Sequence, residues 1–261
     1  MAAFTVTDEQ VAQFNDDGYL IVENLFNEQE TELLLNISTH DQEKCDTVEA
    51  VYDMDGKAAK LWYTSEIKDD IYTAICQSRR IACTMDTLLG DEIYLYHYKM
   101  IVKEPKVGGA WEWHQDYGYW YDRSLYPDMA SCVIAVDRAS KENGCLQVIK
   151  GSHKIGRINH GTFGTQTGAD PERVEQILEH LELVHCEMSP GTALFFHANL
   201  LHRSDANTSE LPRWSLICCY STKHNPTEEM EGQPCYSPME RWDDDRVAEI
   251  GQRQWESMKS I

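Results

Sequence analysis

Residues 111–121 have the sequence Trp111-Glu112-Trp113-His114-Gln115-Asp116-Tyr117-Gly118-Tyr119-Trp120-Tyr121. This stretch is the most informative part of the chain about its fold and function. On an extended strand, side chains two residues apart point to the same face. His114 and Asp116 would then lie side by side as metal ligands, with Gln115 facing away as a spacer. A lone His-x-Asp pair more often belongs to a polar surface strand. The surrounding aromatic residues argue against an exposed polar face here.

A second group of candidate ligands lies downstream, where residues 195–204 have the sequence Phe195-Phe196-His197-Ala198-Asn199-Leu200-Leu201-His202-Arg203-Ser204. One histidine from this segment would complete a triad of two histidines and one carboxylate, which leaves open positions on non-haem Fe(II). His197 ends an apolar strand, where a core histidine bonded to backbone is expected. His202 lies where the strand gives way to polar residues, a position typical of a ligand at a rim. Spacing favours His202 and leaves His197 as the alternative.

Composition limits the partners that this chain can have. It has 261 residues, with 44 acidic against 23 basic side chains and a net charge of −21. Without clustered lysine and arginine, nucleic acid is not an expected partner. The same deficit argues weakly against a coenzyme A thioester, although a local basic pocket could still exist. We therefore expect a small-molecule substrate, and the sequence carries no signal of oligomeric state.

Cysteine usage and the absence of apolar segments predict a cytoplasmic protein. The nine cysteines are odd in number and form no Cys-x-x-Cys motif, which favours reduced thiols. The first residues lack the basic and apolar regions of a signal peptide. No apolar stretch approaches the length that a bilayer requires, so we expect no membrane partner.

The first third of the chain is predicted to be rich in helix. Thr7 and Gln10 form a capping box that begins a helix ending near Gly18, and residues 19–22 follow as a short strand. A second helix is expected from Asn27. The apolar spacing over 66–89 predicts one further helix that ends at Gly90.

After residue 90 the pattern changes to β-branched and aromatic residues. Strands are predicted over 92–102, 131–136, 145–149, 192–196 and 214–220, which together indicate a sandwich or jelly roll. One long interruption, 154–182, contains a helix with Asp170 as N-cap and Pro171 at its first position. Interruptions of this length are usually functional, and we expect a lid. A short helix is predicted near 245–258.

Three groups of residues together resemble the phytanoyl-CoA dioxygenase family. They are His114-Gln115-Asp116, the segment 143–154 (Asn143-Gly144-Cys145-Leu146-Gln147-Val148-Ile149-Lys150-Gly151-Ser152-His153-Lys154), and His202-Arg203-Ser204 with Asn207-Thr208-Ser209 and Arg213. The resemblance extends from about Thr7 to Tyr220. It implies a mainly β protein with flanking helices, built on a double-stranded β-helix (a jelly roll, cupin-like). It also implies an oxygenase that uses Fe(II), 2-oxoglutarate and O2.

The predicted organisation is a single oxygenase domain over 1–261. Its parts are a helical N-terminal third (1–90), a β-helix core (about 91–221) and a C-terminal tail (222–261).

The resemblance also implies roles for individual residues. It makes His202 the third iron ligand with His114 and Asp116, and Arg213 the partner of the distal carboxylate of 2-oxoglutarate. A guanidinium suits that role because it offers two charge-assisted hydrogen bonds to a carboxylate. Ser204 matches a residue that binds the same carboxylate. Cosubstrate-binding positions are also matched by Met100 and, across a segment of different length, by Lys60; Val133 falls where some members carry tryptophan.

The aromatic residues around the motif have two interpretations. They either belong to the core or form a substrate wall made by Trp113, Tyr117, Tyr119 and Trp120. As a wall in an acidic protein they favour a small amine or quaternary ammonium substrate.

Resemblance to bacterial family members, some of which hydroxylate aminophosphonates, implies hydroxylation of a C–H bond with release of succinate and CO2. Related halogenases lack the carboxylate at the position of Asp116, so its presence favours hydroxylation. Two alternatives remain open: the same chemistry on an acyl-CoA thioester, and a β-helix protein that binds a metal or ligand without catalysis.

Overall fold

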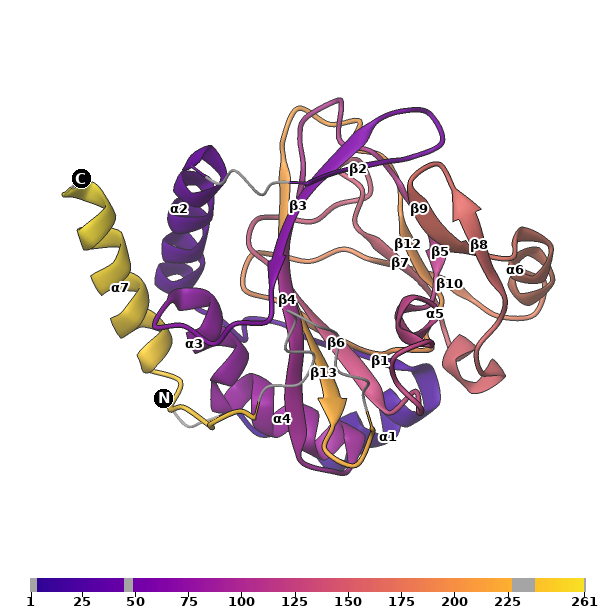
Figure 1. Cartoon of the computed structure of the whole chain (residues 1–261), viewed down its shortest axis with the longest axis horizontal. Helices are drawn as coiled ribbons and strands as arrows, with labels where there is room; N and C mark the ends of the chain where they lie inside the picture. Colours follow the sequence, from indigo (N-terminus) through magenta and orange to yellow (C-terminus); the bar gives the residue numbers. More distant parts are fainter. Residues whose placement is uncertain (1–3, 45–48, 227–237, 261) are drawn as a thin grey trace.

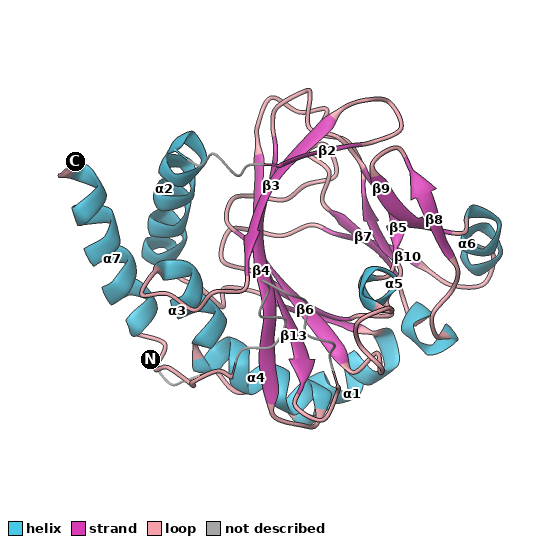
Figure 2. Cartoon of the chain, viewed as in Figure 1, coloured by secondary structure: helices cyan, strands magenta, loops and turns pink. Residues whose placement is uncertain are grey.

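Two β-sheets form the body of the protein, and helices cover the outer face of the larger one (Figures 1 and 2). The computed structural model describes residues 4–44, 49–226 and 238–260. The larger sheet has the strand order β1-β11-β6-β13-β4-β3-β2, and the smaller sheet has the order β10-β7-β12-β5. A separate hairpin joins β8 to β9. Apart from one short 3-10 helix at Ser152–Ile155, the elements run in chain order as α1 (Asp8–Asp17), β1 (Tyr19–Val22), α2 (Glu28–Lys44), β2 (Glu49–Tyr52), β3 (Ala58–Thr64), α3 (Ile71–Gln77), α4 (Arg79–Leu89), β4 (Ile93–Lys103), β5 (Trp111–His114), α5 (Asp116–Trp120), β6 (Met129–Ala135), β7 (Leu146–Ile149), β8 (His160–Phe163), β9 (Gln166–Ala169), α6 (Pro171–Leu178), β10 (Leu183–Cys186), β11 (Ala193–His197), β12 (His202–Ser204), β13 (Arg213–Thr222) and α7 (Arg246–Lys259).

The larger sheet buries a different apolar cluster on each face. Its outer face packs against α1 to α4 and α7, in a cluster that includes Ile37, Ile75, Met85, Met100 and Phe195. Its inner face contributes to the cluster between the two sheets, which includes Leu61, Ile101, Val148, Phe196 and Ile217. Because strand side chains alternate, neighbours such as Met100 and Ile101 belong to opposite clusters.

The register of β4 has one irregularity that affects the inner face. In the pairing with β13 the register shifts between Cys219 and Tyr220, so that Cys219 pairs with His97 and Tyr220 with Leu95. The extra residue in β4 is Tyr96. A bulge of this kind breaks the alternation, and Tyr96 and His97 both line the inner side of the sheet.

The predicted jelly roll and most of the predicted elements are present. The capping box of Thr7 and Gln10 begins α1, and Gly18 ends it with a positive φ of 82°. The N-cap at Asp170 and the proline after it begin α6 as predicted. The helix expected near 245–258 is α7.

Two expectations for the first third were wrong. The predicted helix over 66–89 is two helices, α3 and α4, because Ser78 between them has extended dihedral angles and its hydroxyl donates to the carbonyl of Ile75. Residues 49–64 form the hairpin β2–β3. The Asp53 carboxylate accepts from the amides of Asp55 and Lys57, and Gly56 takes a positive φ in the turn. With β1, this hairpin places three strands of the first third in the larger sheet.

Within the ranges described, no helix combines the length and the apolar character that crossing a membrane requires.

A buried ion pair holds α4 against α2. The Arg80 guanidinium donates to both carboxylate oxygens of Glu30 and to the carbonyl of Leu25, and the two side chains are only 8% and 4% exposed. Replacing Arg80 with methionine would leave the Glu30 carboxylate buried without its partner. We expect R80M to lower the free energy of unfolding by about 3–5 kcal/mol in urea titrations.

The matched control is R79M. Arg79 pairs with Asp243 at the surface, so its loss should cost about 1 kcal/mol or less. Equal losses in the two variants would contradict the importance of the buried pair.

Candidate active site

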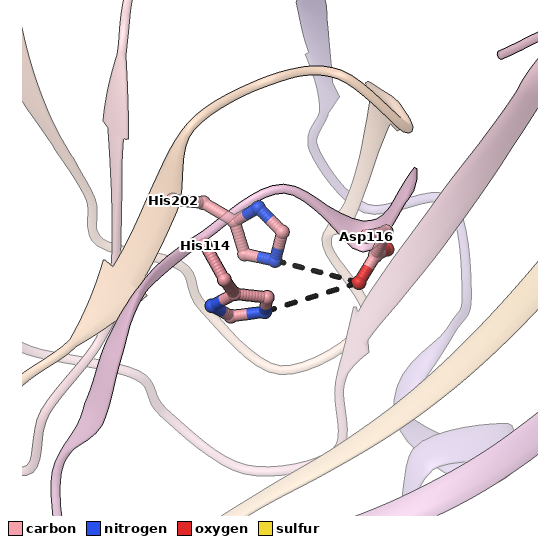
Figure 3. Close-up of side chains that lie close together, drawn as sticks. All are labelled: His114, Asp116 and His202. Carbon is pink, nitrogen blue, oxygen red and sulfur yellow. Dashed lines mark ion pairs between the residues drawn. The ribbon is translucent and has the colours of Figure 1, made fainter. Parts of the chain in front are cut away.

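His114, Asp116 and His202 converge between the two sheets (Figure 3). His114 ends β5 and His202 begins β12, and the two residues pair directly in the smaller sheet. The Asp116 Oδ1 atom lies 3.9 Å from Nε2 of His114 and 3.8 Å from Nε2 of His202. One ligand atom from each residue lies within 4.8 Å of the others, and all three side chains are buried.

The local backbone explains why a histidine and a carboxylate two residues apart can meet. The strand ends at His114, and Asp116 is already the first residue of α5. Gln115 between them keeps extended dihedral angles, φ −110° and ψ 135°. Side chains 114 and 116 therefore point to the same side, as expected, although Asp116 does not lie on a strand.

Backbone carbonyl groups fix the orientation of both imidazole rings. Nδ1 of His114 lies 2.7 Å from the carbonyl oxygen of Glu112, and Nδ1 of His202 lies 2.9 Å from that of Leu200. A carbonyl can only accept, so Nδ1 carries the proton and Nε2 presents a lone pair toward Asp116. Burial lowers the pKa of both histidines, which keeps them in the neutral form that binds metals.

A hydroxyl from the larger sheet orients the carboxylate. Ser131 of β6 donates its Oγ proton to Oδ2 of Asp116 at 2.6 Å. That bond occupies one carboxylate oxygen and leaves Oδ1 facing the two histidines. Hydrogen bonds of this kind to ligand side chains commonly tune metal affinity.

Gln115 contributes more than spacing, contrary to expectation. It is fully buried, and its side-chain amide donates to the carbonyl groups of Gly156 and Asn199 while its carbonyl accepts from the amide of Ile158. Its own backbone amide donates to Nε2 of His160. Gln115 therefore ties the segment that carries His114 and Asp116 to the loop around 156–158 and to Asn199, which precedes the third ligand.

The donor set fits a divalent transition metal. Two neutral imidazole nitrogens and one carboxylate oxygen around a common point are the ligands of the facial triad of non-haem iron. His114 and His202 come from the smaller sheet and Asp116 from α5, and a triad of this kind would leave positions on a bound ion for other ligands.

A narrow inner cavity borders the triad on one side. Its lining includes His114, Asp116, His202, Ser204 and Arg213, with apolar walls from Ile101, Val133, Phe196 and Ile217. Arg213 is buried, its Nη1 donates to the carbonyl of Gly144, and its Nε has no hydrogen-bond partner among the described residues. Burial lowers the pKa of Arg213 to about 10, so the side chain stays cationic at neutral pH. A buried guanidinium with an unsatisfied N–H fits a carboxylate ligand.

A wider outer cavity of about 580 Å³ borders the triad on the other side. It shares His114, Asp116, Lys99 and Trp111 with the inner cavity. Its other walls come from strands β2 to β4, from α5 and the loop after it, and from Thr165 and Gln166 in the β8–β9 hairpin. The triad thus lies where the two cavities meet.

Comparison with known proteins decides the family. The model of the phytanoyl-CoA dioxygenase family matches residues 14–215, most of the chain. The chain belongs to the phytanoyl-CoA dioxygenase family. It is an Fe(II)- and 2-oxoglutarate-dependent dioxygenase, which confirms the predicted family, enzyme class and cofactors.

Curated relatives are similar over most of their length. Ectoine dioxygenase of Bordetella bronchiseptica is 24% identical over 85% of this chain and 78% of the relative. L-proline trans-4-hydroxylase of Streptomyces griseoviridis is 27% identical over 68% of this chain and 72% of the relative. Methylphosphonate hydroxylase of Gimesia maris is 29% identical over 83% and 81%, respectively.

Solved structures confirm the fold class. The crystal structure of EctD from S. alaskensis with 2-oxoglutarate and 5-hydroxyectoine has a TM-score of 0.75 and 23% identity, and the match covers 92% of this chain and 89% of EctD. The epimerase SnoN in complex with Fe3+, alpha ketoglutarate and nogalamycin RO has a TM-score of 0.74 and 17% identity, covering 90% and 94%. The double-stranded β-helix predicted from sequence is therefore confirmed.

This member of the dioxygenase family brings together only some of its sequence-predicted site residues. Ser204, Val133 and Arg213 line the inner cavity, and Tyr119 and Trp120 line the outer one. The alternative ligand His197 lies apart from the triad, where its Nδ1 accepts from the amide of Asn199. Thr165 and Gln166 show that the 154–182 segment borders the outer cavity, while its movement as a lid stays a prediction.

Two predicted cosubstrate residues lie elsewhere. Met100 packs in the cluster between the sheet and the helices, because alternation along β4 gives the inner face to Lys99 and Ile101 instead. Lys60 of β3 is 43% exposed and pairs with Glu104 at 2.8 Å. Neither side chain lines either cavity.

Two predicted substrate residues were also misplaced. Trp113 points to the side of β5 opposite His114, where the Arg203 guanidinium lies 5.0 Å from its ring centroid. Tyr117 is buried between the sheets, and its hydroxyl donates to the carbonyl groups of Ser124 and Leu125. Their neighbours in sequence, Tyr119 and Trp120, reach the cavity because α5 replaces the expected strand.

Ser131 provides a test of how the ligands are oriented. Without its hydroxyl, Asp116 loses the bond that aims Oδ1 at the histidines. We expect S131A to weaken Fe(II) binding about 10- to 100-fold in anaerobic titrations.

Ser215 offers a matched control, since it is buried in the neighbouring strand β13 and makes no bond to the triad. S215A should bind Fe(II) as the wild type does. An S131A protein with unchanged affinity would show that the Ser131–Asp116 bond does not orient the ligand.

Proposed function

We propose that this protein hydroxylates a C–H bond of a small molecule at a centre formed by His114, Asp116 and His202, with release of succinate and CO2. The observation that carries the proposal is the buried triad at the junction of an inner and an outer cavity. A dioxygenase of this type must hold two organic molecules beside one metal ion. Both cavities border the proposed metal site, the inner one at all three ligands and the outer one at His114 and Asp116.

Each part of the site has a distinct role in this proposal. The triad binds Fe(II), and Arg213 with Ser204 holds the distal carboxylate of 2-oxoglutarate in the inner cavity. When bound, iron and 2-oxoglutarate supply the oxidising power for the C–H bond. The apolar walls made by Ile101, Phe196 and Ile217 exclude water around the ligands. Asp116 occupies the position that a halide would need, which supports hydroxylation over halogenation.

The outer cavity supports a small substrate. The relatives named ectoine dioxygenase, L-proline trans-4-hydroxylase and methylphosphonate hydroxylase support substrates in that size range. An acyl-CoA thioester would place its phosphates near the mouth of the cavity. One exposed carboxylate that lines the cavity, Glu49, would repel them, whereas the carboxylate of Glu66 is paired with Lys68 at 2.7 Å.

We also propose that residues 1–261 form one oxygenase domain that works in the cytoplasm. The single domain is supported by β1, β2 and β3, which complete the larger sheet from within the first third. The cytoplasm is supported by the seven described cysteines, all of which are free thiols.

Anaerobic absorbance tests the proposed function directly. Wild-type protein with Fe(II) and 2-oxoglutarate should show the visible charge-transfer band of a chelated keto acid. H202A should lose the band, because the iron loses one of its three protein ligands. H197A should keep it, because His197 lies outside the triad. A wild-type protein without the band would refute the proposal.

Arg213 provides a second, independent test. Loss of a charge-assisted bond to a carboxylate costs about 1.5–3 kcal/mol, so R213M should raise the Kd for 2-oxoglutarate about 10- to 100-fold. R213K keeps the positive charge but cannot form two parallel hydrogen bonds to a carboxylate. Its Kd for 2-oxoglutarate should lie between those of the wild type and R213M. R138M, at an exposed position, is the control. Unchanged affinity in R213M would place the cosubstrate elsewhere.

A further inference from the structure

The outer cavity contains two cations for which the described part of the chain offers no carboxylate partner. Lys99 of β4 and Arg123, which follows α5, both line it, and both are partly buried. Across the described ranges, neither side chain forms an ion pair or a hydrogen bond. This is unusual in a chain with 44 acidic and only 23 basic residues. On nearby strand positions, Lys60 pairs with Glu104, and Lys103 donates to the carbonyl groups of Ser204 and Asp205.

The backbone gives Lys99 a fixed place beside the metal ligands. In the larger sheet Lys99 pairs with Tyr63 on one side and Ile217 on the other, well inside the strand. Its side chain points to the inner face and lines both cavities together with His114 and Asp116. A lysine at this position is therefore directed at the space where a substrate must approach the iron.

Lys99 and Arg123 lie close enough to act on the same neighbour. Burial lowers the pKa of His97 to about 3; the charges of Lys99 and Arg123 also lower it, while the Asp116 carboxylate acts in the opposite direction. His97 is thus neutral and adds no charge of its own. The wall around these residues is aromatic, with Tyr63, Tyr96, Trp111, Tyr119 and Trp120.

We infer that the substrate carries an anionic group, a carboxylate or a phosphonate, which binds between Lys99 and Arg123 while the aromatic wall surrounds its carbon skeleton. The inference rests on the proposed function and names the substrate class of that same site. Partly buried cations without partners are costly, and a bound anion would satisfy them.

The same observation argues against the quaternary ammonium substrate that the aromatic residues and the acidic composition favoured. A simple cation beside the iron would be repelled by both side chains. The carboxylate of Glu49, which also lines the cavity, is exposed, so an amine on the same substrate would face outward. A zwitterion with its anion inward fits this distribution of charge.

The cosubstrate is the other anion that Lys99 could contact, because Lys99 borders the inner cavity as well. Arg123 lines only the outer cavity. The two sources of the anion are therefore distinguished by which Michaelis constant changes when each cation is removed.

The first experiment compares matched compounds by the succinate formed with Fe(II) and 2-oxoglutarate. L-proline and methylphosphonate provide the anions, L-prolinamide and dimethyl methylphosphonate are their counterparts without the anionic group, and choline is the quaternary ammonium. We expect an anion to stimulate succinate formation and its counterpart and choline to have no effect. Stimulation by the counterparts or by choline would overturn the inference.

Variants then test the two side chains with the anion that stimulates. Each of K99M and R123M should raise the KM for that anion about 10- to 100-fold, because a charge-assisted contact is lost. The KM for 2-oxoglutarate should stay unchanged in both. K99R and R123K should keep most of the affinity. K141M removes one charge at an exposed position and should behave as the wild type.

Two further outcomes would overturn the inference. In one, the variants raise only the KM for 2-oxoglutarate, which would assign the cations to the cosubstrate. In the other, no anion stimulates although the anaerobic absorbance band is present. That second result leaves the oxygenase proposal standing, whereas loss of the band refutes the oxygenase proposal itself.

Discussion

Two backbone carbonyl groups determine what the rest of this site can do. Glu112 and Leu200 accept the Nδ1 protons of His114 and His202, and this leaves both Nε2 lone pairs facing Asp116. Glu112 lies on β5, whose neighbour in the smaller sheet is β12, and Leu200 lies in the turn just before β12. Ser131 adds a constraint from the opposite sheet by occupying the second oxygen of Asp116. Metal geometry therefore depends on how the two sheets face each other, not on the ligand residues alone.

Alternation along the central strands places the residues that pack against the helices on one face and the residues that line the cavities on the other. On β4, Met100 and Val102 pack under the helices, while Lys99 and Ile101 face the cavities. The bulge at Tyr96 adds a second consecutive side chain to the functional face. The outer face of β4 is thus apolar where the helices cover it, and the inner face combines cations, rings and metal ligands.

The sequence predicted the fold class, the meeting of His114, Asp116 and His202, and the nearness of Arg213 to them, because each has a local pattern or a family motif. It assigned Met100 to the cosubstrate pocket from the family resemblance, whereas alternation along β4 directs Met100 to the helices and Lys99 and Ile101 to the cavities. It missed Ser131 and Gln115 because their partners lie 15 and 41 or more residues away. Trp113 and Tyr117 were misjudged because the strand was expected to continue past His114, where the chain turns into α5.

The hydrogen bonds of Gln115 have a consequence for changing this enzyme by design. They join the residue between two metal ligands to Gly156 and Ile158, at the start of the segment that reaches the outer cavity, and to Asn199, which precedes His202. A loop graft over 154–182, the obvious route to a new substrate preference, would replace two of these partners. The grafted loop and the iron site would therefore have to be selected together, with the backbone around 156–158 retained as part of the catalytic framework.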